Sequence, residues 1–255
     1  MPQWDPNQYL QFISQRTQPC IDLVARINLD EVNDVVDLGC GPGNSTEVLA
    51  KKFPRATIVG FDNSPDMIAQ AKKDYPQFTF APGDAATWTA NRKCDVILAN
   101  AVFQWVAHHE SLLPRLVQQL RHRGVLAVQM PRNFESPTHT VLREIASRPQ
   151  WDQKVRTRDL HWAQPPDFYF DLLSPITSKL EIWETEYIHI MPDHDAIVQW
   201  YKGTGLRPYL EPLSSDDQEK FIAEYKDEIA KQYPPQKTGQ VLFPFRRIFF
   251  LAYNA

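Results

Sequence analysis

The stretch VVDLGCGPGNSTEVLA, residues 35–50, constrains the fold of this chain more than any other segment. Its apolar start predicts a buried strand over 34–38, and an Asn-Ser-Thr cluster then opens a helix over 44–53. Between them, Gly39, Gly41 and Gly43 allow a tight turn and leave the backbone bare for a ligand. The free N–H groups of the helix start also face this turn. Strand, glycine turn and helix in this order predict a ligand-binding α/β unit.

The alternation of strand and helix continues along the first half of the chain. Further strands are expected at 56–62, 78–84, 94–100 and 124–130, with helices at 64–75 and 110–124 between them. Such alternation is typical of a parallel sheet covered on both faces. The predicted fold class is therefore α/β, with a doubly wound, mostly parallel sheet.

The second half has a different pattern. Two more strands are expected at 180–190 and 246–254, with helices at 193–232 between them, which would extend one edge of the sheet. The economical interpretation is a single domain over 1–255 with a helical cap. Its parts would be an N-terminal helical segment at 1–30, broken near Pro19, and cap insertions at 131–178 and 191–240.

Composition excludes several classes of function. The net charge of −4 argues against nucleic-acid binding, which needs a basic surface. The sequence contains no apolar stretch of 18 residues, so no membrane span is predicted. The start, MPQWDPNQYL, lacks the pattern of a signal peptide, and Cys20, Cys40 and Cys94 suit the reduced thiols of a cytoplasmic protein. No His, Cys and acid spacing predicts a metal site, and no obligate protein partner is evident. The pair His108–His109 is expected to be a solvated helix start.

Three acids indicate what the glycine turn binds. The dinucleotide fingerprint is G-x-G-x-x-G, whereas this loop has G-x-G-x-G with Asp37 two residues ahead of Gly39. A carboxylate there would repel a pyrophosphate and attract an ammonium group. Asp62, at the end of the second strand, can accept hydrogen bonds from ribose hydroxyls, and Asp84 in PGDA can meet an adenine amino group. Ribose and ammonium without phosphate describe S-adenosylmethionine.

Two other classes of protein fit the sequence less well. A nicotinamide-dependent oxidoreductase is disfavoured by the glycine spacing, and calorimetry with each cofactor would decide between the two. A non-catalytic binding protein with a degenerate fold is disfavoured by the intact loop and acids. Methyl incorporation from labelled cofactor would test that alternative.

Several segments resemble the trans-aconitate 2-methyltransferase family, within the class I S-adenosylmethionine-dependent methyltransferases. They are DLGCGPGNST, NAVFQWVAHH, GVLAVQMPRNFESPTH, TEYIHIMP, TGLRPYL and RIFFLA. The resemblance implies a seven-stranded sheet with a reversed hairpin at one edge. It also implies methyl-ester formation on trans-aconitate, a small anionic substrate, with S-adenosylhomocysteine as the product.

The resemblance also suggests residue roles. It assigns Asp37, Gly39 and Gly41 to the methionine part of the cofactor, Asp62 to the ribose, and Asp84 with Ala85 to the adenine. The segment after the fourth strand would border the sulfonium. The full set of cofactor candidates is Asp37, Gly39, Cys40, Gly41, Asp62, Asn63, Met67, Asp84, Ala85, Asn100 and Phe103.

The chain departs from the family pattern at charged positions. Gln15 and Gln18 stand around Arg16 where the family has an acid and a second base, and Arg132 follows VLAVQMP where an acid is common. These changes leave another small carboxylic acid or metabolite open as the substrate.

The expected reaction needs no general base, since a carboxyl group with a pKa near 4 is already an anion at pH 7. No catalytic residue of that kind is therefore predicted, and the protein's part is to position the reactants. Arginine suits a polycarboxylate because its planar fork binds carboxylates bidentately. The substrate-binding candidates are Arg16, Gln104, Trp105, Arg132, Arg207 and Tyr209.

Overall fold

The computed structural model describes residues 13–155 and 163–255, except for the side chains of 13–16. These residues form two compact units that are described separately. Unit 1 contains residues 13–132, 163–185 and 247–255, and unit 2 contains 133–155 and 186–246. No helix in the described part of the chain is long and apolar enough to cross a membrane.

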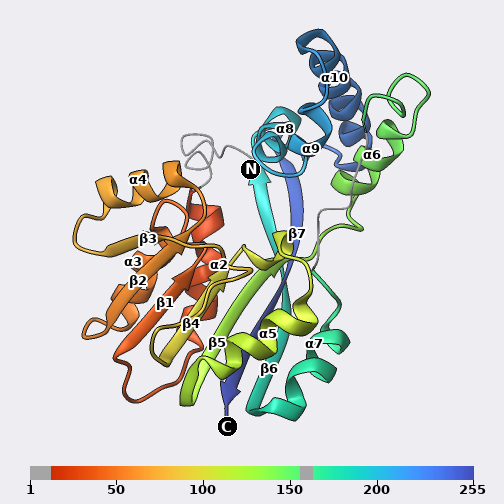
Figure 1. Cartoon of the computed structure of the whole chain (residues 1–255). Coiled ribbons are helices and arrows are strands. Elements are labelled where there is room, and N and C mark those ends of the chain that lie inside the picture. Colours follow the sequence, from red (N-terminus) through yellow and green to blue (C-terminus); the bar gives the residue numbers. More distant parts are fainter. Residues whose placement is uncertain (1–12, 156–162) are drawn as a thin grey trace. The chain divides into compact units, whose positions relative to one another are not determined.

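A seven-stranded sheet with the order β3-β2-β1-β4-β5-β7-β6 organises unit 1 (Figure 1). β1 pairs in parallel with β2 and β4, β2 with β3, and β4 with β5, whereas β7 runs antiparallel to β5. The expected mostly parallel, seven-stranded sheet is therefore confirmed, with β7 as the strand that runs opposite to β5 near one edge. The strands are β1 (Asp34–Leu38), β2 (Thr57–Asp62), β3 (Thr79–Pro82), β4 (Cys94–Asn100), β5 (Leu120–Pro131), β6 (Thr177–Met191) and β7 (Val241–Asn254).

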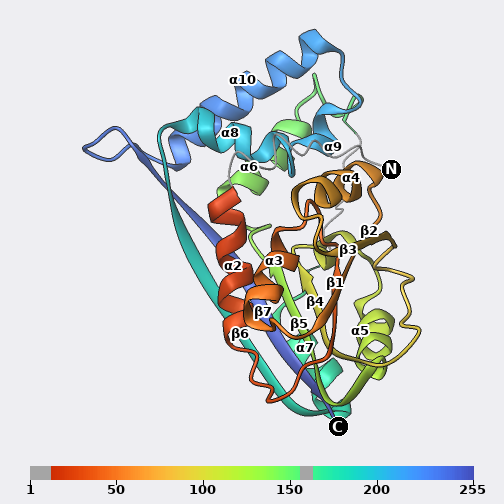
Figure 2. The same ribbon diagram turned by 90° about the vertical axis from the view of Figure 1, so that its left-hand side faces the viewer.

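Helices cover both faces of this sheet. α5 (His109–Gln118) and α7 (Pro166–Leu173) pack on one face, where Leu116 and Tyr169 belong to the same core cluster as strand residues such as Ile97. The other face carries α2 (Ile13–Ala25), α3 (Asn44–Lys52) and α4 (Pro65–Asp74) (Figure 2). Because side chains alternate along a strand, each strand serves both layers. β1 is an example, since all five of its residues are buried.

The boundary between α5 and β5 differs from the expectation. The helix expected over 110–124 ends at Gln118, and β5 begins at Leu120, which pairs with Cys94. The error arose because Leu116, Val117 and Leu120 are all buried and continue a helical spacing, although Leu120 already belongs to the strand. Inside β5, Arg123 has a left-handed backbone (φ 63°) directly before Gly124.

Two other expectations were also wrong in detail. α2 continues through Pro19 instead of breaking there, and the proline ring is buried in the helix face. Of the segment 131–178, which was expected to be a cap insertion, residues 163–178 lie in unit 1, where Tyr169 and Leu173 of α7 are fully buried in the core.

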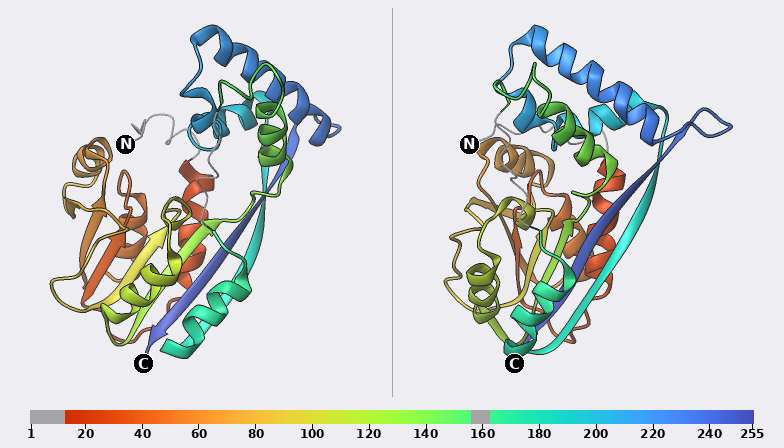
Figure 3. Two further views of the ribbon diagram at one scale, coloured as in Figure 1. Left: turned by 45° about the vertical axis from the view of Figure 1, so that its right-hand side comes forward. Right: turned by 90° about the vertical axis from the view of Figure 1, so that its right-hand side faces the viewer.

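Unit 2 is built from helices and the distal parts of β6 and β7, which run beside each other (Figure 3). Its core is aromatic: Tyr201, Tyr225 and Phe243 are fully buried and their rings make mutual contacts. The helices are α6 (Pro137–Ala146), α8 (His194–Lys202), α9 (Arg207–Leu210) and α10 (Ser215–Gln232).

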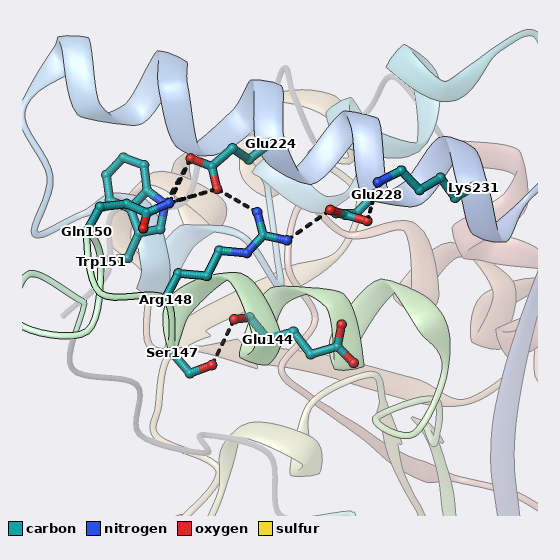
Figure 4. A network of polar contacts seen from close by, with 8 residues as sticks. All are labelled: Glu144, Ser147, Arg148, Gln150, Trp151, Glu224, Glu228 and Lys231. Atoms are coloured by element: carbon teal, nitrogen blue, oxygen red, sulfur yellow. Dashed lines mark hydrogen bonds and ion pairs between the residues drawn. The ribbon is translucent and has the colours of Figure 1, made fainter.

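A polar network joins the end of α6 to α10 (Figure 4). Arg148 donates from Nη1 to Glu224 Oε2 at 2.8 Å and from Nη2 to Glu228 Oε1 at 2.9 Å. The Trp151 indole N–H also donates to Glu224, at 3.2 Å. These contacts all lie within unit 2, which indicates a structural role for this network.

Candidate functional site

The polar residues predicted to bind the cofactor lie at the carboxyl ends of neighbouring strands. Asp37 lies near the end of β1, Asp62 ends β2 and Asn100 ends β4, while β1 lies between the other two strands. Asp84 follows the last residue of β3, and the short helix η1 (Phe103–Trp105) follows β4. Because parallel strands present their carboxyl ends at one edge, the fold gathers these residues from four separate segments, as the sequence predicted.

The glycine turn has the backbone conformation that glycine favours. Gly39, Gly41 and Gly43 have φ of 72°, 54° and 99°. A Cβ on Gly39 would lie 2.1 Å from Val102 Cγ2, so close packing requires glycine there. A Cβ on Gly41 would meet no described atom within 4 Å. The backbone at Gly41 therefore faces open space, which a ligand can approach.

Asp62 holds the turn in place. Its Oδ2 accepts a hydrogen bond from the Gly41 N–H at 2.9 Å, and its Oδ1 accepts from the Ser64 N–H at 2.8 Å. Burial raises the pKa of Asp62, and these backbone hydrogen bonds oppose that rise. A carboxylate has about four lone-pair positions, so both oxygens can still accept from ligand hydroxyls.

Asp37 is fully buried. Its Oδ2 accepts hydrogen bonds from the hydroxyls of Ser45 and Thr46, both at 2.7 Å, while no described donor reaches Oδ1. Burial is the main cause that raises the pKa of Asp37 to about 6. The sequence analysis missed the two hydroxyls, although their place in the first turn after the glycines was a usable signal.

This raised pKa predicts a pH-dependent stability. Between about pH 4 and 6 the folded state holds a proton on Asp37 that the unfolded state has released, so stability falls as pH rises and is level above about 6. This rise in the pKa of Asp37 corresponds to roughly 3 kcal/mol of unfolding free energy. Asp37→Asn should flatten this part of the profile, as measured by urea unfolding at pH 4.5 to 7.5. A wild-type profile of the same slope as the variant's would contradict the assignment.

Three amide side chains at the ends of β4 and β5 have unsatisfied polar atoms. Asn100 Oδ1 and Gln104 Oε1 are buried without a described partner, although Gln104 Nε2 donates to Ala101 O at 2.8 Å. Gln129, fully buried on β5, lacks a described partner for both Oε1 and Nε2. The sequence analysis missed Gln129. Its signal was a single polar residue inside the apolar run GVLAVQM.

The substrate-binding candidates are distributed over both units. Arg132 Nη1 donates to Glu184 Oε1 at 2.7 Å in unit 1, and Arg207 Nε donates to Glu211 Oε1 at 2.8 Å in unit 2. Tyr209 is buried in unit 2. Gln104 and Trp105 belong to η1 of unit 1, whereas the side chain of Arg16 lies outside the described residues.

The remaining cofactor candidates differ in exposure. Asp84 and Asn63 are exposed and Gly39 is half-buried. The Asp84 carboxylate accepts a hydrogen bond from the Ala86 N–H at 2.9 Å. Four candidates are buried: Cys40, Met67, Ala85 and Phe103.

His109 corrects the expectation of a solvated helix start. It is 2% exposed, and its ring nitrogens lie 2.8 Å from Phe103 O and 3.0 Å from the Tyr169 hydroxyl. Burial lowers its pKa. His108 is exposed beside Glu110, as expected. His109 thus ties α5 to η1 and α7, and its hydrogen bonds fix the segment that follows β4.

The donor and acceptor pattern of the site fits S-adenosylmethionine. The unsatisfied acceptors at Asp37 and Asn100, together with the carboxylate of Asp62, suit a ligand that carries an ammonium group and ribose hydroxyls. A pyrophosphate offers no donors to these oxygens. In the described part of the chain, no cluster of three or more His, Cys, Asp or Glu side chains could hold a metal ion.

Comparison with known folds gives the same architecture. YcgJ of Bacillus subtilis is 13% identical with a TM-score of 0.61, and the match covers 92% of this chain and 98% of that chain. A chain in the complex of the Haloferax volcanii Trm112 activator with a putative methyltransferase is 14% identical with a TM-score of 0.56, covering 98% and 94%. These similarities establish the fold.

Sequence relatives identify the family. The methyltransferase domain family matches residues 35–124. A trans-aconitate 2-methyltransferase of Rhodopseudomonas palustris (strain BisB18) is 46% identical over 254 residues, covering 99% of both chains. A protein of the same name from Azoarcus sp. (strain BH72) is 44% identical, and the match covers 99% of both chains. The one from Escherichia coli O157:H7 is 42% identical, and the match covers 99% of this chain and 98% of that protein. The chain therefore belongs to the trans-aconitate 2-methyltransferase family.

Proposed function

We propose that this protein transfers the methyl group of S-adenosylmethionine to a carboxylate of trans-aconitate, forming a monomethyl ester and S-adenosylhomocysteine. The observation that carries the proposal is the identity of 42–46% to proteins of that name along nearly the whole chain. The acids and the open glycine backbone at the carboxyl ends of β1 and β2 support the cofactor part of the proposal.

The cofactor supplies an activated methyl group on a sulfonium, and the protein's own residues supply its position. Asp62 accepts hydrogen bonds from the ribose hydroxyls, and Asp84 with Ala85 borders the adenine. Asn63 and Met67, which follow β2, flank the nucleoside. The methionine part lies along the glycine turn at Gly39–Gly41, within reach of the negative field of Asp37. Asn100 and Phe103 border the reacting end.

No side chain is assigned to remove a proton, because the attacking carboxylate is already ionised at pH 7. Holding two reactants in line can lower a barrier by roughly 7–11 kcal/mol, which makes position the main contribution. Buried His109 uses both ring nitrogens to hold η1 and α7, consistent with a structural role.

The substrate-binding set remains Arg16, Gln104, Trp105, Arg132, Arg207 and Tyr209. Arg132 donates to Glu184 from Nη1 and Arg207 donates to Glu211 from Nε. Because a guanidinium carries five N–H donors, these glutamate contacts do not by themselves prevent binding of a substrate carboxylate. The proposal also places the enzyme in the cytoplasm, with no membrane, nucleic-acid or obligate protein partner. The buried free cysteines Cys20, Cys40 and Cys94 are compatible with that location.

Arg207→Ala should raise KM for trans-aconitate by about 10-fold or more, because it removes a charge-assisted hydrogen bond to the substrate. The effect on kcat should be smaller. Steady-state kinetics measures this. Glu211→Ala is the matched control: it removes the glutamate that engages Arg207 and should leave KM equal or lower. Equal KM values for Arg207→Ala and the wild type would contradict a role for Arg207.

The function itself is tested with methyl-labelled cofactor and a panel of small di- and tricarboxylic acids, with products identified by mass spectrometry. The proposal predicts label in an ester of trans-aconitate, with kcat/KM higher than for the other acids. Faster transfer to a different acid would replace the substrate, and transfer to none would overturn the proposal.

A further inference from the structure

Gln129 is a buried polar residue of unit 1 that the roles assigned above do not use. Gln129 is fully buried, and both its Oε1 and its Nε2 lack a partner among the described residues. Buried polar side-chain atoms are paired in most proteins, and leaving one unpaired carries a free-energy cost. Two unpaired atoms on one side chain therefore need an explanation, and a ligand provides one.

The register of the sheet places Gln129 beside the predicted cofactor site. Gln129 is the Cα partner of Asn100 on parallel β4, and the Ala101 N–H donates to Gln129 O at 2.9 Å. Paired residues on adjacent strands point to the same face. Asn100 Oδ1 is likewise buried without a described partner. The two amides are therefore neighbours at the carboxyl ends of β4 and β5.

Formal charge changes sign across this end of the sheet. On one side, Asp62 lies on β2 and Asp37 on β1. The neutral amides of Asn100 and Gln129 follow on β4 and β5, and buried Arg247 lies beyond them on β7. On β7, Phe249 pairs with Gln129 and Arg247 pairs with Pro131, so Arg247 shares the face of Gln129. The acidic side suits the cationic cofactor, and the side next to Arg247 suits an anion.

We propose that the Gln129 side-chain amide binds a carboxylate of the substrate, next to Asn100 on the cofactor side and Arg247 on the other. The inference rests on the function proposed above, because it names a residue that holds the acid to be methylated. The Gln129 amide nitrogen donates to a carboxylate oxygen of the substrate. A half-turn flip of the amide exchanges Oε1 and Nε2, so the N–H donor can lie at either of the two positions. Gln129 then contributes to selection of carboxylate substrates.

The test replaces Gln129 with methionine, which has nearly the same shape and no hydrogen-bonding amide. Gln129→Met should be more stable to heat than the wild type, because it removes two unsatisfied buried atoms. Its kcat/KM for trans-aconitate should fall by about 10- to 100-fold, mainly through KM. Calorimetry should give an S-adenosylhomocysteine Kd unchanged within about twofold, since the amide does not hold the cofactor. Gln118→Met, on the exposed end of α5, is the matched control for kinetics and stability.

The combination of higher stability and weaker substrate binding separates this role from a structural one. An unchanged kcat/KM, a parallel loss of cofactor affinity, or a less stable Gln129→Met protein would overturn the assignment of Gln129 while leaving the proposed function standing. A wild-type protein that methylates none of the acids in the panel would overturn both.

Discussion

Asp62→Ala is expected to weaken S-adenosylhomocysteine binding by about 100-fold or more. The substitution removes a charged acceptor for two ribose hydroxyls, each worth roughly 1.5–3 kcal/mol. It also leaves the Gly41 N–H, which Asp62 now holds at 2.9 Å, without its acceptor. Both effects act on the binding surface, so the change should appear in Kd by calorimetry and in KM for the cofactor.

Asp74→Ala is the matched control. It removes the same type of side chain, but from an exposed position at the end of α4. It should bind the cofactor product as the wild type does. Asp62→Asn keeps one acceptor oxygen and should give an intermediate Kd. Equal affinities for Asp62→Ala and Asp74→Ala would show that the ribose does not bind at the end of β2.

Alanine at Gly41 is expected to weaken cofactor binding by at least about 10-fold while costing only about 1–2 kcal/mol of stability. The cost comes from the left-handed backbone, φ 54°, because an added Cβ meets no described atom within 4 Å. The loss of binding comes from a methyl group in the open space where the ligand approaches. Calorimetry and urea unfolding measure the two effects separately.

Gly239 provides a close control. It too is left-handed, φ 84°, with no described atom within 4 Å of an added Cβ, but it belongs to unit 2. Gly239→Ala should lose similar stability and no cofactor affinity. Gly39→Ala should lose considerably more stability, since its Cβ would lie 2.1 Å from Val102 Cγ2. If Gly41→Ala and Gly239→Ala bound the cofactor equally well, the open space at Gly41 would not be the ligand site.

The first four strands, β1 to β4, were predictable from sequence because they are short and separated by clear turn signals. The error at α5 and β5 shows the limit of this approach: Leu116, Val117 and Leu120 keep a helical spacing across a boundary that pairing with Cys94 decides. Strand pairing depends on residues far apart in the chain, so local periodicity does not detect it. Pro19 was misjudged for a related reason, since tertiary packing of its buried ring outweighs its helix-breaking tendency.

The candidate site was predictable where strand ends and glycines give a local signal, as at Asp37, Gly41 and Asp62. Contacts that depend on packing were not predictable. Nothing local in the sequence indicated that His109 would be buried against Tyr169, or that Arg132 would pair with Glu184. Gln129 was overlooked because a single glutamine in an apolar strand has many interpretations until its neighbours are known.

A crystal structure of the protein with S-adenosylhomocysteine tests the central claim most directly. The account predicts ribose hydroxyls within hydrogen-bonding distance of Asp62, adenine beside Asp84 and Ala85, and the amino-acid part along Gly39–Gly41. A nucleoside bound elsewhere, with Asp62 still bonded only to backbone N–H groups, would contradict it.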